Sequence, residues 1–463
     1  MKLNESSERF PSQLQRKTSV LAAVTVTTPR QQWRSLAYLL ASARPDMQDR
    51  STTETESPHP LQSPRIERLL SLDAYRGLIM ISLAFVGFGL ADTANNYLEE
   101  NPDSTFWQGV QYQFSHAQWV GCSYWDLIQP SFMFMVGASM AYSYAKRQSQ
   151  GHSYARMCCH AFSRALILIL LSVFLISTSQ SQTDWAFTNV LAQIGLGYGF
   201  LFLLWKRSPT VQAVAAVAIL LVVCGMFELY PNPGIDLAKG APELGVSQEW
   251  AEENLSDVRK PWHKNANIGH AIDVRFLNWF PTQEAFEFNA GGYQTLNFLP
   301  SIVTMLFGLM SGELLRSPRS ARFQLLTLFL GGLAALGIGY ALDYYHVCPL
   351  VKRIWTPTWA IFSTGWCCLI LGSLYGIIDV LKLRAWSFPL VVVGMNSIAI
   401  YCMSMTLKPW IGRQLKIHLG TEIFSLYGNV SPAVVPSVQA TLVGLMLWLA
   451  CYFLYRNKAF LRI

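Results

Sequence analysis

Residues 115–139, SHAQWVGCSYWDLIQPSFMFMVGAS, join a polar, aromatic run to a long apolar run. They contain one histidine, His116, and one acid, Asp126, ten positions later. Pro130 and the apolar run follow at once, so we expect His116 in a short loop and Asp126 where that loop enters a membrane helix. An ionisable pair at a membrane boundary is costly unless it has partners, and a histidine there can exchange a proton near neutral pH. The alternative is a hydrogen-bonded histidine beside an aspartate that caps the helix.

The composition around this stretch is that of a membrane protein. Of 463 residues, 52% are apolar and only 14% are charged, whereas ordinary soluble domains carry about 25% charged residues. The net charge of +7 is therefore interpreted by where the positive charges fall, and we expect no nucleic-acid partner. The nine cysteines show no C-x-x-C spacing and the histidines no metal-spaced pair. We expect cysteines that pack in helices and no metal site.

Ten segments have the length and apolar character of transmembrane helices. We therefore expect an all-α polytopic membrane helix bundle of about ten transmembrane helices over residues 67–463. Residues 1–66 are rich in polar residues and Pro, and we expect a disordered cytoplasmic tail there. The ten segments are 77–94, 126–145, 161–179, 186–205, 210–229, 293–315, 322–343, 357–381, 386–408 and 433–455.

Positive charges are distributed unevenly among the connections of these helices. None occurs between Arg76 and Lys146, whereas the connections 146–164 and 316–322 are rich in them. Lys and Arg accumulate on the cytoplasmic side of membrane proteins. This asymmetry predicts that both termini are cytoplasmic and that His116 and the long loop 231–292 are extracytoplasmic.

Four residues are candidates for binding a phosphate-bearing ligand on the cytoplasmic side. Arg76 and Arg164 lie at the starts of the first and third helices, where a guanidinium can bind a phosphate through two hydrogen bonds or simply set topology. Asn396 and Ser397 are adjacent polar residues inside the ninth helix. They either bond to neighbouring helices or line a cavity. Asp73, just before Arg76, is expected to cap the first helix.

Other polar and aromatic residues are candidates for binding a substrate on the outer side. Lys352 and Trp355 open the eighth helix in KRIWTPTW, residues 352–359. They match either an interfacial belt or a site for a polar acceptor such as a sugar ring. Trp119 accompanies His116 in its motif and is a further acceptor-binding candidate. Gln193, inside the fourth helix, either bonds to a neighbouring helix or lines a cavity.

Taken together, these motifs resemble the membrane domain of the heparan-α-glucosaminide N-acetyltransferase family and its bacterial relatives. That resemblance implies an all-helical membrane domain in which His116 occupies the position of the catalytic histidine and Asp126 that of the nearby acid. The matching pieces, in the family's order, are residues 68–77, 116–121, 126–139, 352–359, 394–398 and 455–458.

The resemblance also implies an activity. The family moves an acetyl group from cytosolic acetyl-CoA to a glucosamine amine across the membrane, so we expect acetyl-CoA as co-substrate and an amine or hydroxyl of an amino sugar or glycan as acceptor. A neutral imidazole can take the proton that such a group loses, and burial keeps the imidazole neutral. We expect a multi-pass protein in the lipid bilayer of a bacterial inner membrane, with a homodimer as one possible assembly.

Three positions depart from the family's pattern. The stretch 85–89 around Gly87 lacks the usual Asn, Gln193 follows Ala where the family has a Gln-Arg pair, and Ser404 stands where a His-Glu pair begins. Two other functions stay open: a transporter of a small sugar or anion, and a non-catalytic relative. Many transporters show two similar halves, and the sequence shows no such repeat.

Overall fold

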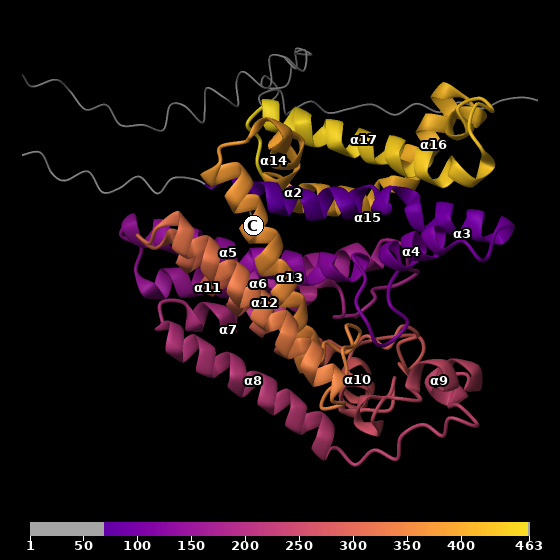
Figure 1. Cartoon of the computed structure of the whole chain (residues 1–463), viewed down its shortest axis with the longest axis horizontal. Helices are drawn as coiled ribbons and strands as arrows, with labels where there is room; N and C mark the ends of the chain where they lie inside the picture. The colour runs from indigo at the N-terminus through magenta and orange to yellow at the C-terminus, as the bar shows by residue number, and fades with distance from the viewer. Residues whose placement is uncertain (1–68, 462–463) are drawn as a thin grey trace, which may run out of the picture. The chain divides into compact units, whose positions relative to one another are not determined.

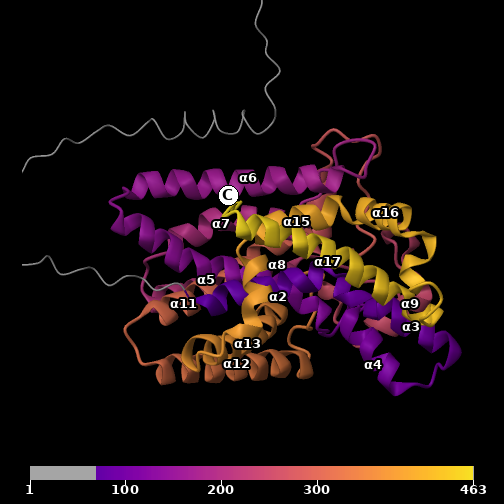
Figure 2. The ribbon, with the colours of Figure 1, turned by 90° about the horizontal axis from the view of Figure 1, so that it is seen from above.

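A computed structural model of the chain describes residues 69–461, and the expected disordered tail at 1–66 lies outside them. The described residues form helices joined by loops, with only three isolated β-bridges and no strand among them. This confirms the all-α class. Figure 1 shows the bundle, and Figure 2 shows α6 and α12 on its opposite sides with α2 and α5 between them.

Six helices among the described residues are long and apolar enough to cross a membrane, or up to eight if each of two bent helix pairs forms one span. Much of the apolar surface of α8 and α12 is exposed, as lipid-facing helices require. These observations support a multi-pass membrane protein. The six helices are α6 (Tyr154–Ser177), α8 (Pro209–Leu229), α11 (Phe298–Arg316), α12 (Ala321–Tyr344), α13 (Pro357–Leu374) and α17 (Val435–Arg456).

We expected ten membrane spans, but fewer helices among the described residues are long and apolar enough to cross a membrane. All ten predicted segments nevertheless contain helix. The second segment is α5 (Ile128–Ser149), which ends in polar and basic residues, and the fourth is α7 (Val190–Leu204), with 15 residues. Both are mostly buried inside the bundle. They line the cavities described below.

Helix α5 is held tightly against α11 through glycines. A Cβ on Gly137 would lie 1.8 Å from the Met305 carbonyl oxygen, and one on Gly308 would lie 2.0 Å from the Phe134 carbonyl oxygen. Only glycine lets two backbones approach so closely, which is how small residues pack membrane helices. The contact fixes α5, and with it the loop that carries His116.

The first predicted helix, 77–94, is wrong in its bounds. Helix α2 (Leu70–Ala84) begins earlier because the Asp379 carboxylate accepts the Leu70 and Ser71 N–H groups at 3.3 and 3.0 Å. Asp73, the expected cap, instead pairs with Arg76 at 3.1 Å. After Ala84 the chain bends by 49° into α3 (Leu90–Glu100).

The ninth predicted helix is also two pieces. Helices α14 (Phe388–Gly394) and α15 (Ser397–Thr406) meet at 68°, with Asn396 at the break. Helices α4 (Thr105–Phe114) and α16 (Lys408–Leu419) complete the bundle.

The long loop 231–292 is a packed structure with its own core. It contains α9 (Gln248–Leu255) and α10 (Ile268–Leu277). The Trp262 ring is fully buried and stacks on Phe227 of α8, with ring centroids 4.7 Å apart. The loop 231–292 therefore forms a packed cover, and it contacts the loop that carries His116 through Trp119.

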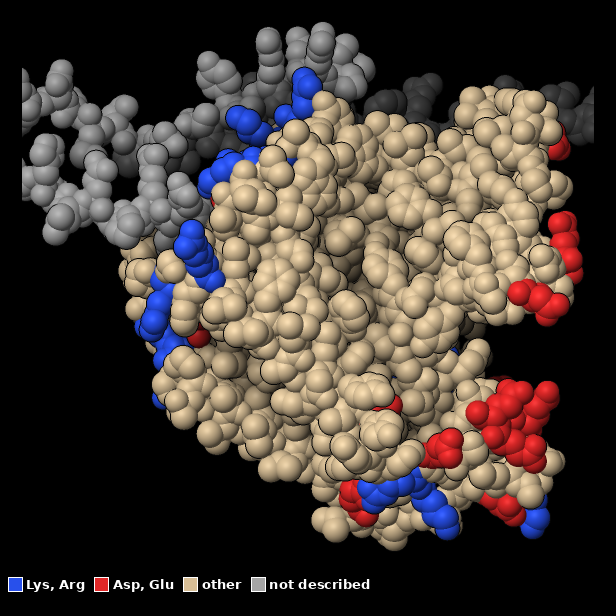
Figure 3. Space-filling view, in the orientation of Figure 1, with Lys and Arg blue, Asp and Glu red and all other residues tan. Residues whose placement is uncertain are grey.

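Charged residues separate along the bundle. Figure 3 shows Lys and Arg gathered at the end where α5 and α11 finish, and Asp and Glu gathered at the other end, over α3 and α9. A smaller group of Lys and Arg lies among the acids at the lower edge of this view, where the loop 231–292 pairs Lys239 with Asp236 and Arg259 with Glu228. The orientation was predicted from the Lys and Arg residues of the connections alone, and it stays a prediction.

Candidate functional site

His116, Asp126 and Lys352 meet in one hydrogen-bonded cluster. His116 Nδ1 lies 2.7 Å from Asp126 Oδ1, and Lys352 Nζ lies 3.1 Å from the same oxygen. Lys352 Nζ is also 3.1 Å from His116 Nδ1. The Asp126 and Lys352 side chains are almost fully buried, at 1% and 6% exposure, whereas 39% of the His116 side chain is accessible. The histidine is thus the exposed member of a buried charge cluster.

The loop before α5 is folded around the Asp126 carboxylate. Its second oxygen accepts the Ala117 N–H at 3.0 Å and the Ser123 hydroxyl at 3.0 Å. The residue preceding α5 is Leu127, and no side chain caps this helix. The helix-cap alternative for Asp126 therefore does not describe its role: its oxygens hold the histidine, the lysine and the loop.

The hydrogen bonds select one tautomer of His116. Asp126 Oδ1 can only accept, and at 2.7 Å it is the nearest partner of Nδ1, so Nδ1 carries the proton that is donated to Asp126. The Lys352 ammonium then donates to Asp126 Oδ1 and not to the protonated Nδ1. Nε2 then has a lone pair, and it has no hydrogen-bond partner within residues 69–461. A neutral imidazole with a free Nε2 is the form that accepts a proton from a substrate.

The surroundings favour this neutral form. Partial burial lowers the pKa of His116, the Asp126 hydrogen bond opposes this, and the Lys352 charge lowers the pKa further. Burial alone would raise the pKa of Asp126, but the His116 hydrogen bond and the Lys352 charge outweigh it and hold that pKa well below its usual range. Asp126 is ionised while His116 stays neutral.

His116 opens onto a cavity of about 510 Å³, which we call the histidine cavity. It extends between α5, the loop before α7, α15 and the loop that precedes α11. Its lining is mixed, with carboxylate, amide and aromatic groups near the histidine, as suits a polar organic molecule. The lining includes His116, Trp125, Gln129, Phe132, Asp184, Asn189, Asn289, Tyr293, Lys352 and Tyr401.

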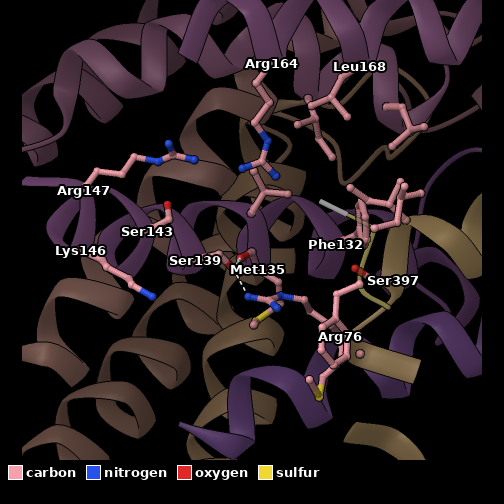
Figure 4. Close-up of a pocket in the computed structure, with 18 of the residues that line it drawn as sticks. Arg76, Phe132, Met135, Ser139, Ser143, Lys146, Arg147, Arg164, Leu168 and Ser397 are labelled. Atoms are coloured by element: carbon pink, nitrogen blue, oxygen red, sulfur yellow. Dashed lines mark hydrogen bonds between the residues drawn. The ribbon is translucent and has the colours of Figure 1, made fainter. Parts of the chain in front are cut away.

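A second cavity of about 500 Å³ lies further along α5 and is lined by four cationic side chains; we call it the cationic cavity. The cations are Arg76, Lys146, Arg147 and Arg164. Figure 4 shows Arg76 and Arg164 reaching toward it from opposite walls, with Arg147 and Lys146 along a third side. This lining suits an anionic ligand, and guanidinium groups suit phosphates in particular.

The two predicted arginines are positioned by neighbours on other helices. Arg76 donates to the Ser139 hydroxyl of α5 besides pairing with Asp73. Arg164 donates to the Tyr198 hydroxyl at 3.1 Å and lies over that ring. Ser397, the third predicted residue, also lines the cationic cavity.

Asn396 does not line the cationic cavity. It is fully buried at the break between α14 and α15, and its Oδ1 accepts the Leu461 N–H at 3.3 Å. The cavity is lined by its neighbours, Met395 and Ser397. Asn396 therefore ties the bend to the end of the chain.

Three residues predicted to bind the acceptor lie away from the histidine cavity. Trp119 is buried, packs against Trp250 and donates to the Trp262 carbonyl, so it belongs to the core of the cover. Trp355 is buried in the main core against Trp359. Gln193 is buried, and its amide donates to the Phe187 carbonyl at 2.7 Å, in the loop before α7, and to the Thr295 carbonyl at 3.3 Å, in the short helix that precedes α11.

Sequence reasoning missed several residues that line the cavities. Lys146 and Arg147 were counted only as charges that set topology, although they follow the apolar run of α5 directly. Asp184 and Tyr293 belong to connections between helices and line the histidine cavity. No pattern in the sequence indicated that Asp184 and Tyr293 line a cavity, because the packing of distant helices determines where their loops lie.

The fold and the two cavities describe a multi-pass helical membrane protein with an ionisable site at one cavity and a cationic site at the other. The chain is similar to heparan-α-glucosaminide N-acetyltransferase of Homo sapiens, at 23% identity over 428 residues, and to that of Mus musculus, at 24% identity over 441 residues. Each match covers 86% of this chain and 60% of the relative.

The chain thus spans about 60% of the length of the curated relatives it matches, and no family model matches it. The similarity supports a family relationship with these transferases without specifying a member.

Proposed function

We propose that the protein is a membrane acetyltransferase that moves an acetyl group from acetyl-CoA in the cationic cavity to an amine of an amino sugar or glycan in the histidine cavity. The observation that carries the proposal is the His116–Asp126 pair, with a free Nε2, at the wall of a cavity in a helical membrane protein. The similarity to N-acetyltransferases supports the same class of reaction. The gathered positive charges favour a cytoplasmic position for the cationic cavity.

The donor assignment depends on charge. Coenzyme A carries several phosphate groups, and the cationic cavity offers the Arg76, Arg164, Lys146 and Arg147 side chains. Charge-assisted hydrogen bonds from such groups to phosphate are about twice as strong as neutral ones. The residues present therefore fit the donor, and they hold its anionic part away from the histidine cavity.

The reaction needs one proton acceptor near the acceptor amine. The amine nitrogen attacks the thioester carbonyl carbon, so that a C–N bond forms and the C–S bond breaks. Nε2 of His116 takes the proton that the nitrogen loses, and the departing thiolate takes one proton, for which the protonated His116 is a donor. Asp126 fixes the ring through Nδ1 and stabilises its charged form.

Acetyl transfer from labelled acetyl-CoA to a panel of amino sugars tests the proposal. In purified protein, His116→Ala should retain acetyl-CoA binding and lose about 10²–10⁴ in single-turnover rate, as loss of a general base does. His418→Ala, on the exposed end of α16, is the control and should behave as the parent does. A His116→Ala rate within about threefold of the parent, far short of a general-base effect, would contradict the assignment.

The same preparation separates the alternatives. Reconstituted into sealed vesicles, a transporter would take up a labelled sugar without acetylating it, and a non-catalytic relative would show no transfer to any acceptor.

A further inference from the structure

The two cavities share one residue. Phe132 of α5 lines both the histidine cavity and the cationic cavity. Along α5, Gln129 lies on the histidine side of Phe132, and Val136 and Ser139 lie on the cationic side. These positions are three or four residues apart and share one face of the helix. The face of α5 thus runs from one cavity into the other, with the Phe132 ring between them.

A second helix repeats this arrangement. On α15, Ser397 lines the cationic cavity and Tyr401, one turn later, lines the histidine cavity. The rings of Phe132 and Tyr401 stack with centroids 6.4 Å apart and planes at 20°, and both side chains are buried. The two aromatic rings therefore stack at Phe132, the residue that both cavities share.

The two rings are held differently. The Tyr401 hydroxyl donates to Asn189 Oδ1 at 2.9 Å, and that oxygen also accepts the Leu191 N–H that begins α7. Tyr401 is therefore anchored to the bundle. Phe132 has no polar anchor and is held by packing alone, so a side-chain rotation is the smallest motion that breaks this stack.

The geometry points to Phe132 as the positioning residue that separates donor from acceptor and admits the acyl group between the cavities. This inference rests on the proposed function: an amine beside His116 can attack a thioester only when the reacting atoms come within about 3–3.5 Å. A donor whose phosphates stay among the arginines must extend its uncharged arm past Phe132. The ring also keeps the two cavities from forming a continuous aqueous path.

Cysteine labelling tests the partition without acetyl-CoA. In a background with the nine native cysteines replaced, Gln129→Cys reports the histidine cavity and Val136→Cys the cationic cavity. A small charged thiol reagent is applied from the side that labels Gln129→Cys. Val136→Cys should react slowly in the parent and about tenfold faster or more with Phe132→Ala, because the surroundings of a truncated ring close only partly.

Two further variants make the result decisive. Phe132→Leu is a milder opening and should give an intermediate rate, while unchanged Gln129→Cys labelling shows that each variant is folded. Leu168→Ala removes a side chain from the wall of the cationic cavity alone and should leave Val136→Cys slow. Fast labelling of Val136→Cys in the parent, or no acceleration in Phe132→Ala, would overturn the inference.

The outcome is separable from that of the proposed function. If the parent shows no acetyl transfer to any acceptor, the proposed function fails, and labelling still decides whether Phe132 divides the cavities. If the parent transfers acetyl groups and labelling shows no barrier at Phe132, only the partition is wrong.

Discussion

At the scale of single residues, the charge of Lys352 influences how His116 titrates. Burial and then the Lys352 charge lower the pKa of His116 against the Asp126 hydrogen bond. If the neutral ring is the general base, as proposed, activity should persist below the ordinary histidine value of about 6.5 and fall as the pH drops through the lowered pKa. Lys352→Met removes a charge that opposes protonation, so its acidic limb should move to higher pH.

The pH profile of kcat/KM tests this assignment, with acetyl-CoA binding as the check that each variant is folded. Lys239→Met is the control, because Lys239 is exposed and its ion-pair partner within residues 69–461 is Asp236, far from His116 in the sequence. The proposed effect of Lys352 on the pKa of His116 would be excluded by either of two results. One is an acidic limb of the parent profile above the ordinary histidine value, and the other is an acidic limb at the same pH in Lys352→Met and the parent.

Also at the residue scale, the arginines of the cationic cavity should determine affinity for the donor. Arg164→Ala removes one charged group from that cavity and should weaken acetyl-CoA binding by about 1.5–3 kcal/mol if one charge-assisted hydrogen bond is lost. Arg76→Ala should act in the same direction. Arg156→Ala, exposed at the start of α6, should leave the dissociation constant unchanged. The dissociation constants are measured by calorimetry. If all three variants bind acetyl-CoA as tightly as the parent does, the arginines serve topology only.

The sequence identified site residues that contact each other within one loop, but not those that are brought together by the packing of distant helices. His116 and Asp126 lie ten positions apart in one loop, so their pairing followed from local sequence. Lys352 reaches them only because α13 packs beside α5, and its role in the cluster was not predictable. Trp119 and Trp355 show the limit of composition, because a large aromatic side chain suits a buried core as well as a sugar site.

At the scale of elements, the hydropathy of the chain indicated the helices but not their breaks. The stretch 77–91 is apolar apart from Ser82, yet the backbone at Gly87 and Gly89 has positive φ values of 58° and 65°. A Cβ on Gly89 would lie 2.5 Å from the Pro436 carbonyl oxygen of α17. The bend therefore depends on a contact with a helix more than 300 positions away, which no local pattern shows.

The contact between α2 and α14 gives the prediction at this scale. A Cβ on Gly77 would lie 1.8 Å from the Leu390 carbonyl oxygen. The obstacle is backbone, so Gly77→Ala should separate the helices and cost about 1–3 kcal/mol. Gly337→Ala in α12 is the matched control, since nothing lies within 4 Å of its Cβ position, and alanine is the better helix former by about 1 kcal/mol.

Thermal unfolding in detergent distinguishes the two variants. Gly77→Ala should melt below the parent, and it should also bind acetyl-CoA more weakly because Arg76 adjoins Gly77 and lines the cationic cavity. A melting temperature of Gly77→Ala equal to that of Gly337→Ala would show that the α2–α14 contact is not tight.

At the scale of the whole molecule, the separation of charges makes a prediction about orientation. Lys and Arg gather where α5 and α11 end, and Asp and Glu gather over α3 and α9. Positive residues are retained on the cytoplasmic side, so the cationic cavity should face the cytoplasm and the histidine cavity the outside. In that orientation, the proposed donor made inside the cell would meet the arginines and the proposed acceptor outside would meet His116, without either crossing the bilayer.

Single cysteines at the two ends test this orientation in intact cells. Gln118 and Gln148 are both exposed, the first beside His116 and the second at the end of α5. In a background with the native cysteines replaced, Gln118→Cys should react with a membrane-impermeant thiol reagent in intact cells, and Gln148→Cys only after permeabilisation. The opposite pattern would reverse the orientation and place the acceptor site on the side where acetyl-CoA is made.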